Sequence, residues 1–231
     1  MFILIIMLKI AHRGSTLATI TDHRGNDNYY KFPENSLLAY INAIEQKFDM
    51  VEADIILTKD EKLIMFHEQY IGSTPVNSLT YLEIKNRFKH VITFDVFCYE
   101  ILPRIKVLLD IKGDNKTALK IIDFFKDNDL DLSRFYFSSF NRNHLLTLYN
   151  YNNKLKLGII YDGVLLDIEK EFIINILKLS FVSICWKHLY DTEIKFYNKK
   201  NIPIFAWTNF NHITRRAIPT NIDGIITDYY F

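Results

Sequence analysis

Short apolar segments alternate with helical patterns along most of the chain, and this alternation limits the folds available to it. The segments that indicate strands begin at residues 8, 51, 105, 135, 155, 181, 203 and 224. Apolar residues between them recur at helical spacing, as at Leu37, Ile41 and Ile44. Such alternation is typical of a parallel α/β sheet. Eight units in 231 residues fit a closed (β/α)8 barrel, a TIM barrel, of typically about 250 residues, and a doubly wound open sheet is the alternative.

The predicted helices occupy the intervals between these strands. A helix opens at Pro33–Ser36, and others are expected over residues 78–88, 93–102, 116–126, 141–149, 168–179, 192–199 and 211–217. The helix over 78–88 should be capped by Ser78 and should bury Leu82 and Ile84. The polar or mixed residues between Gly14 and Pro33 are expected to form a loop, because Thr19–Asp22 is a poor strand sequence.

Composition favours one globular domain spanning residues 1–231. Hydrophobic residues make up 49% and charged residues 24% of the chain, which are ordinary values for such a domain. The net charge of +1 gives no reason to expect a nucleic-acid partner. Cys98 and Cys185 are far apart and match no metal-binding spacing, so we expect a reducing compartment, although one disulfide bridge stays open.

The apolar start of the chain, residues 1–8, is interpreted as part of the first buried strand. It is too short to span a bilayer, and it lacks the basic segment and cleavage site of a signal peptide. A short membrane-associating or signal-like tail is the alternative. We therefore predict a cytoplasmic protein for which membrane contact is possible but not indicated.

The stretch Val51–His67 predicts a β-hairpin that carries acidic side chains. Two apolar runs flank the polar turn Thr58–Lys62, and a turn centred near residues 59 and 60 would set Glu52 opposite His67. Glu52 and Asp54 are two residues apart and share a strand face. Two such carboxylates repel each other unless a cation lies between them, and Mg²⁺ or Ca²⁺ prefers oxygen ligands. An edge hairpin with its charges in water is the alternative.

Residues suited to chemistry fall at the ends of the predicted strands. In a TIM barrel the active site lies at the carboxyl ends of the strands. The residues at or near such ends are His12, Glu52, Asp54, Asp110, Lys112 and Trp207. Their positions played no part in placing the strands, so this convergence independently supports a site there.

Taken in order, nine short motifs resemble the glycerophosphodiester phosphodiesterase family. They are His12–Gly14, Pro33–Ser36, Glu52–Asp54, Thr58–Asp60, His67–Glu68, Asp110–Lys112, Ser138–Phe140, Ala206–Asn209 and Gly224–Asp228. Each motif alone is weak, but the ordered set spans nearly the whole chain. The family has a (β/α)8 barrel fold, which agrees with the strand count.

The resemblance implies a metal-dependent phosphoric diester hydrolase that releases glycerol 3-phosphate and an alcohol from glycerophosphodiesters. One divalent cation, Mg²⁺ or Ca²⁺, would be held by Glu52, Asp54 and Asp110. His12 would serve as the general base and His67 as the general acid, since imidazole titrates near neutrality. The attacking group is water or a neighbouring hydroxyl of the substrate.

The remaining site residues have two interpretations each. Arg13 would bind phosphate or form a salt bridge to Glu34, and Lys112 would bind phosphate or lie on the surface. Trp207 would pack against the glycerol or headgroup, or belong to the core. Glu34 and Asn35 would orient the site or simply cap a helix. The other histidines, His90, His144, His188 and His212, are expected to be ordinary surface or core residues.

Three departures from the family pattern bear on these assignments. The third metal ligand is usually Glu, whereas this chain has Asp110. The link from Gly14 to Pro33 is longer than usual and contains a second His-Arg-Gly at residues 23–25; that copy fits the family spacing better, but only His12 follows an apolar strand directly. The segment from His67 to Asp110 is short, which predicts a more open site.

Two rival functions stay open. An Asp as third ligand also occurs in the related sphingomyelinase D-like phospholipases, so a lysophospholipid or sphingolipid headgroup is a possible substrate, and an exposed apolar rim would favour it. A barrel that binds phosphodiesters without turnover is the other, and a splayed acidic cluster, or one salt-bridged by Arg13, would favour it.

Overall fold

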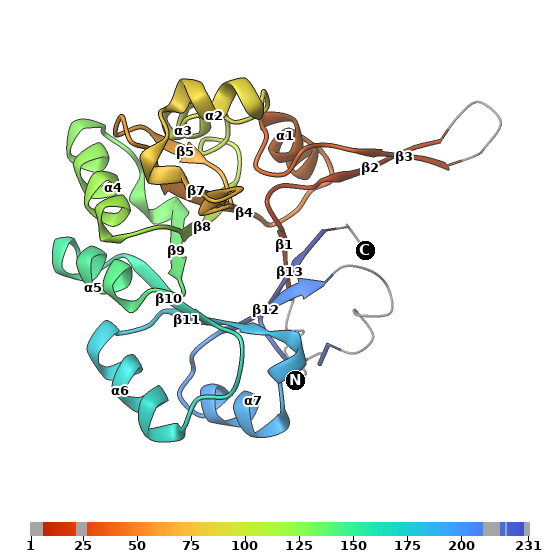
Figure 1. The fold of residues 1–231 in the computed structure, drawn as a ribbon. Helices are drawn as coiled ribbons and strands as arrows, with labels where there is room; N and C mark the ends of the chain where they lie inside the picture. The colour runs from red at the N-terminus through yellow and green to blue at the C-terminus, as the bar shows by residue number, and fades with distance from the viewer. Residues whose placement is uncertain (1–6, 22–26, 210–217, 220, 229–231) are drawn as a thin grey trace.

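Eight parallel strands close into a barrel in the computed structural model, which describes residues 7–21, 27–209, 218–219 and 221–228 (Figure 1). The barrel strands in spatial order are β1 (Leu8–Ala11), β4 (Met50–Leu57), β8 (Lys106–Ile111), β9 (Phe135–Ser139), β10 (Lys156–Tyr161), β11 (Phe181–Cys185), β12 (Ile204–Asn209) and β13 (Gly224–Thr227). The barrel is closed because β1 pairs in parallel with both β4 and β13. The predicted (β/α)8 fold is confirmed, and the open doubly wound sheet is wrong.

Seven helices in the described residues surround the barrel. They are α1 (Leu37–Glu45), α2 (Tyr81–Arg87), α3 (Phe94–Glu100), α4 (Asn115–Asp127), α5 (Arg142–Tyr151), α6 (Asp167–Leu177) and α7 (Asp191–Asn198). Local chemistry sets where several begin, since the side chains of Ser36, Asp114 and Asn141 each accept a hydrogen bond from the first turn. Within these described segments, no helix is long and apolar enough to cross a membrane.

The start of α2 differs from the prediction. Thr80, not Ser78, caps this helix, because Thr80 and Glu83 form a reciprocal capping box, while Val76–Ser78 forms a short 3₁₀ helix, η1. Ile84 is fully buried as expected, but Leu82 is 65% exposed. The expected helix over 211–217 and His212 lie outside the described residues.

Alternation along each strand divides the core into two layers. On β11, Val182 and Ile184 belong to the cluster packed beneath the helices, whereas Phe181 belongs to the small cluster that fills the barrel interior. That interior cluster also contains Ile10, Met50, Leu108, Phe205 and Ile226. Inward-facing residues nearer the carboxyl ends of the strands are therefore left to line a site.

The hairpin predicted from Val51 to His67 is confirmed, with its register shifted by one residue. β5 (Leu63–Met65) pairs antiparallel with β4, and Ile55 lies opposite Met65. Continued toward the barrel mouth, this register sets Ala53, not Glu52, opposite His67. The turn is centred on Asp60 alone, where Thr58 Oγ1 donates a hydrogen bond to its carboxylate.

A second hairpin was not expected. β2 (Leu17–Thr21) and β3 (Asp27–Lys31) pair antiparallel through five residue pairs and extend away from the barrel (Figure 1). The segment predicted as a loop is thus mostly strand, since two polar strands that pair only with each other need no apolar alternation. The second His-Arg-Gly, at residues 23–25, comes between β2 and β3 in the sequence and lies outside the described residues. A short hairpin also joins β6 (Tyr70–Ile71) to β7 (Thr74–Pro75).

Candidate active site

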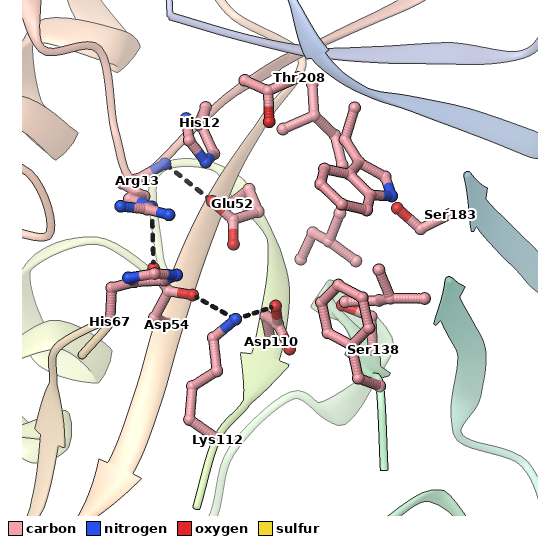
Figure 2. Close-up of a pocket in the computed structure, with 15 residues that line it drawn as sticks. His12, Arg13, Glu52, Asp54, His67, Asp110, Lys112, Ser138, Ser183 and Thr208 are labelled. Carbon is pink, nitrogen blue, oxygen red and sulfur yellow. Dashed lines mark hydrogen bonds and ion pairs between the residues drawn. The ribbon is translucent and has the colours of Figure 1, made fainter. Parts of the chain in front are cut away.

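All eight predicted site residues line one pocket at the carboxyl ends of the barrel strands (Figure 2). They are His12, Arg13, Glu52, Asp54, His67, Asp110, Lys112 and Trp207. The pocket has a volume of about 150 Å³, and a wider cavity of about 700 Å³ shares His12, Arg13 and Trp207 with it. The sequence therefore predicted which residues come together, although not yet what each of them does.

Three buried carboxylates form the floor of the charged part of the pocket. Asp54 on β4 is in register with Asp110 on β8, and Glu52 lies two residues earlier on the same face of β4. The three residues are only 5%, 1% and 5% exposed for Glu52, Asp54 and Asp110, and one oxygen of each lies within 4.8 Å of the others. The alternative of an edge hairpin with its charges in water is wrong for Glu52 and Asp54.

Two cationic side chains reach this cluster. Lys112 Nζ donates to Asp110 Oδ2 at 2.6 Å and lies 3.2 Å from Asp54 Oδ1. Its side chain is 10% exposed, so the interpretation as a surface lysine is wrong. Arg13 donates its backbone N–H to Glu52 Oε2 at 2.8 Å, and its Nη1 donates to Glu34 Oε2 at 2.8 Å. Its Nε lies 3.3 Å from Asp54 Oδ2, so Arg13 does form the predicted salt bridge to Glu34 and contacts the acidic cluster as well.

The carboxylates differ in protonation because their surroundings differ. Burial, together with Asp54 and Asp110, raises the pKa of Glu52 well above its ordinary value. Burial raises the pKa of Asp110 to about 6 despite Lys112. Burial would also raise the pKa of Asp54, but Lys112 and Arg13 outweigh it and lower that pKa to about 2. Without a bound ion, Asp54 is therefore ionised. The nearby positive charges do not outweigh the effect of burial at Glu52 and Asp110.

The donor set fits a hard divalent cation. Asp110 Oδ1 is buried and accepts no hydrogen bond within the described part of the chain. A buried carboxylate oxygen without a partner is unusual, and an ion is one of the few explanations. Three carboxylates in one cluster match the oxygen preference of Mg²⁺ and Ca²⁺. The shorter Asp110 side chain, in register with Asp54, still brings its oxygens to the cluster.

A buried amide holds Asp54 in place. Asn35 Nδ2 donates to Asp54 Oδ2 at 2.9 Å, and Asn35 Oδ1 accepts from the Asp54 backbone N–H at 3.0 Å and from Tyr40 Oη at 2.7 Å. Asn35 adopts a φ of 53°, a left-handed conformation that Asn tolerates better than most residues. The capping residue of α1 is the next residue, Ser36, so the orienting interpretation of Asn35 agrees with the geometry.

Both histidines have a carboxylate on Nδ1. His12 follows the last residue of β1, and its Nδ1 lies 2.6 Å from Asp228 Oδ1, just beyond β13. His67 Nδ1 lies 3.0 Å from Glu68 Oε1. A carboxylate on Nδ1 fixes the ring and leaves Nε2 to exchange a proton with a bound molecule. Asp228 belongs to a motif in the sequence, but no sequence signal linked it to His12 across 216 residues.

The opposite wall contains aromatic and hydroxyl side chains that the sequence left without a role. Phe140 lines the pocket, is 50% exposed, and packs edge-on against Trp207 at a centroid distance of 5.7 Å. Lys112 Nζ lies 5.6 Å from the centre of the Phe140 ring. Ser138, Ser183 and Thr208 also line the pocket. Phe140 and Ser138 stand in a motif, and the period-two alternation of strands could have identified the inward serines.

Three of the other histidines have defined places. His144 is buried and forms hydrogen bonds with Ser139 and with backbone carbonyls. Burial lowers its pKa, and it is a core residue, as expected. His90 lines the wider cavity. His188 lies beside Asp162 and is considered below.

Comparisons with known proteins agree with this fold and site. Residues 23–230 match the glycerophosphoryl diester phosphodiesterase family. A glycerophosphodiester phosphodiesterase of Caldanaerobacter subterraneus is 25% identical, over 89% of this chain and 92% of that protein. The crystal structure of a glycerophosphodiester phosphodiesterase from Thermotoga maritima has a TM-score of 0.73 at 22% identity and covers 96% of this chain and 94% of that one. An Oleispira antarctica phosphodiesterase in complex with the product sn-glycerol-3-phosphate also has a TM-score of 0.73, at 17% identity over 96% and 93% of the two chains.

The family match begins at His23, the first residue of the second His-Arg-Gly, and does not reach His12. The geometry favours His12, since it follows the last residue of β1 directly and lines the pocket. In this chain β2 and β3 lie between the first strand and Pro33, so the second copy is nearer to Pro33 in the sequence than His12 is. With its closed barrel, its buried carboxylates and a family match over 23–230, the chain belongs to the glycerophosphoryl diester phosphodiesterase family, a family of phosphoric diester hydrolases.

Proposed function

We propose that this protein, as one domain over residues 1–231, hydrolyses glycerophosphodiesters to glycerol 3-phosphate and an alcohol in a reaction that requires a divalent cation. The observation that carries the proposal is the buried, unpartnered Asp110 Oδ1 in a cluster of three carboxylates, in the same pocket as two histidines. Lys112 and Arg13 offset part of the negative charge of this cluster, a bound cation would offset the rest, and the substrate is itself an anion that needs neutralising.

Glu52, Asp54 and Asp110 would hold one Mg²⁺ or Ca²⁺, which when bound supplies positive charge to the phosphate and makes an attacking oxygen more acidic. The rest of the site contributes through its own side chains. Lys112 offers a second positive charge beside Asp54 and Asp110. Arg13 has Nη2 left to donate while Nη1 is bound to Glu34.

Proton transfer falls to the histidines. His12, oriented by Asp228, is assigned as the base that removes a proton from the attacking hydroxyl, and His67 as the acid that protonates the departing alkoxide. Each transfer contributes roughly 10²- to 10⁴-fold to the rate. Trp207 and Phe140 form an apolar wall on which the glycerol carbons can pack.

A phospholipase D-like reaction on a lysolipid is the second candidate, and one observation favours it. Three apolar side chains in the connection after β10 and in the first turn of α6 are largely exposed: Val164 at 59%, Leu166 at 69% and Ile168 at 75%. This connection begins at the carboxyl end of a barrel strand, on the side of the barrel where the pocket lies. Such a rim suits an acyl chain better than it suits a small water-soluble diester.

A barrel that binds phosphodiesters without turnover is favoured by the contact of Arg13 with Asp54. The cluster is not splayed, however, and Asp110 keeps a free oxygen for an ion. Catalysis therefore remains our proposal.

The test is to incubate the purified protein with glycerophosphocholine or with lysophosphatidylcholine, each with Mg²⁺, with Ca²⁺ and with EDTA, and to follow products by ³¹P NMR. We expect glycerol 3-phosphate from glycerophosphocholine with at least one metal and none with EDTA. Turnover of the lysolipid alone would support the second candidate. Absence of turnover with metal bound, shown by calorimetry, would contradict the proposal and support the binding role.

A further inference from the structure

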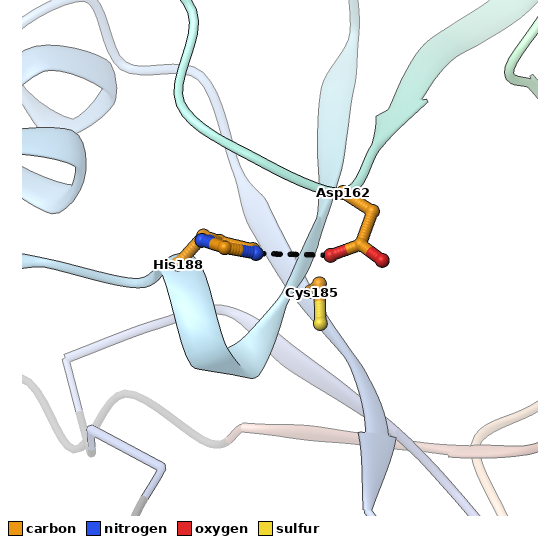
Figure 3. A group of neighbouring side chains, drawn as sticks. All are labelled: Asp162, Cys185 and His188. Atoms are coloured by element: carbon orange, nitrogen blue, oxygen red, sulfur yellow. Dashed lines mark ion pairs between the residues drawn. The ribbon is translucent and has the colours of Figure 1, made fainter.

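A second cluster of potential metal ligands lies at the barrel mouth, outside the acidic site. Asp162, Cys185 and His188 each offer one donor atom, and the three atoms lie within 4.8 Å of one another (Figure 3). His188 Nε2 is 3.0 Å from Asp162 Oδ1. Cys185 is buried and unbridged. The sequence analysis found no metal-binding spacing at Cys185 and took His188 as an ordinary surface or core residue, so it did not bring these three together.

The strand register builds this cluster. Tyr161 on β10 pairs with Ile184 on β11, so Asp162 and Cys185 follow as the next neighbours at the ends of these strands. His188 is the last residue of η3 (Trp186–His188), the 3₁₀ turn that immediately follows β11. All three ligands therefore lie at the carboxyl ends of β10 and β11 or in the turn that follows β11.

The chemistry of these donors differs from that of the acidic site. A thiolate and an imidazole are soft or borderline ligands that select Zn²⁺ over Mg²⁺ and Ca²⁺, whereas Glu52, Asp54 and Asp110 offer oxygen alone. Zinc bonds of about 2.0–2.3 Å place ligand atoms roughly 3.3–3.8 Å apart in a tetrahedron. In the structure His188 Nε2 and Asp162 Oδ1 are 3.0 Å apart, and the atom of Cys185 lies within 4.8 Å of both.

We propose that Asp162, Cys185 and His188 bind Zn²⁺ or another thiophilic divalent cation, with a water molecule as the fourth ligand. The open position faces solvent, because the side chains of His188 and Asp162 are 30% and 56% exposed. The site ties the loop after β10 to η3. Cys185 pairs with Trp207 across β11 and β12, so the bound ion stiffens the wall that carries Trp207. The proposed zinc site includes neither His12 nor His67, the residues assigned to proton transfer.

Cobalt titration tests this proposal through a signal that the acidic site cannot give. Co²⁺ bound to a thiolate has a near-ultraviolet charge-transfer band, and carboxylates alone give none. We expect this band to saturate at one ion per chain and to disappear when Zn²⁺ is added. The band should be absent in Cys185→Ser. In His188→Gln, Co²⁺ should bind with an apparent affinity at least about tenfold lower, equivalent to about 1.4 kcal/mol.

Cys98→Ser is the matched control, because Cys98 is the other free cysteine and lies on the buried side of α3, in the core. It should keep the band. Wild-type protein that shows no band, or Cys185→Ser protein that keeps it, would overturn the proposal. Circular dichroism of each variant shows whether the fold is retained, and the wild-type result alone decides if a variant fails to fold.

Discussion

The two walls of the pocket are built on the same kind of strand but carry different chemistry. The wall from β1, β4 and β8 supplies His12, Glu52, Asp54, Asp110 and Lys112, whereas the wall from β9 to β12 supplies Ser138, Ile160, Ser183, Trp207 and Thr208. The first wall therefore contains charged or titratable groups, and the second contains neutral ones. The contrast suggests a division in which one wall handles the anionic phosphate and the other the organic part of the substrate.

Removing a charge from the first wall should have the largest effect. Asp54→Asn removes the carboxylate that stays ionised, and we expect a loss of several kcal/mol in transition-state stabilisation, about 10³-fold in kcat/KM. Steady-state release of glycerol 3-phosphate measures it. Asp123→Asn, an exposed acid on α4 paired with Lys126, is the matched control and should be unchanged. Equal activity in the two variants would refute the importance of the charged wall.

The support behind that wall should matter less than the ligand itself. Asn35→Gly removes the amide that holds Asp54 while keeping a left-handed backbone conformation available, so metal affinity should fall about 10- to 100-fold. Isothermal calorimetry with Mg²⁺ or Ca²⁺ measures the change. Tyr40→Phe deletes only the hydroxyl that donates to Asn35 and should give a smaller loss. A larger effect from Tyr40→Phe would mean that packing, not orientation, is being measured.

Proton competition should make metal binding on this wall depend on pH. The pKa of Asp110 is raised to about 6 and that of Glu52 is raised too, so below about pH 6 a proton must leave before the ion binds. Affinity should therefore rise with pH, by up to about tenfold per unit for each proton released, as the pH increases toward about 6, where Asp110 loses its proton. Calorimetry in two buffers of different ionisation enthalpy counts those protons. Binding that neither releases protons nor varies with pH would be inconsistent with the assigned ligands.

The neutral wall should give the smallest effect. Trp207→Leu loses an aromatic surface and its contact with Phe140, which corresponds to about 0.5–1.5 kcal/mol, or roughly 2- to 12-fold. We expect most of this in KM and little in kcat. Trp186→Leu alters the chain's other tryptophan, which packs outside the pocket with the helix-side cluster, and is the control. A loss in kcat comparable to that of Asp54→Asn would abolish the distinction between the walls.

Sequence reasoning predicted the barrel well because its strands are short apolar runs. Four of the eight strands begin at the predicted residue, and the other four begin one residue away from it. Residues at strand ends could be assigned to a common site because the fold brings all carboxyl ends together. The hairpin of β2 and β3 was not predicted, since the sequences of its two strands show no regular apolar alternation. The shift of one residue between β4 and β5 depends on turn geometry around Asp60, which short polar sequences do not specify.

The sequence predicted which residues lie at the site better than it predicted which side chains contact one another. The links from Asp228 to His12 and from Tyr40 through Asn35 to Asp54 join residues whose spacing carries no periodic signal. The Asp162, Cys185 and His188 cluster was missed for the same reason, because two strands and a 3₁₀ turn bring its members together. The cytoplasmic location stays a prediction.

The choice between the two His-Arg-Gly copies tests the central claim most directly. We would measure glycerol 3-phosphate release from glycerophosphocholine, with the metal that supports turnover, for His12→Ala and His23→Ala. The geometry predicts a loss of roughly 10²- to 10⁴-fold for His12→Ala and near wild-type activity for His23→Ala. The reverse result would contradict the assignment of His12 and show that the copy at which the family match begins supplies the base.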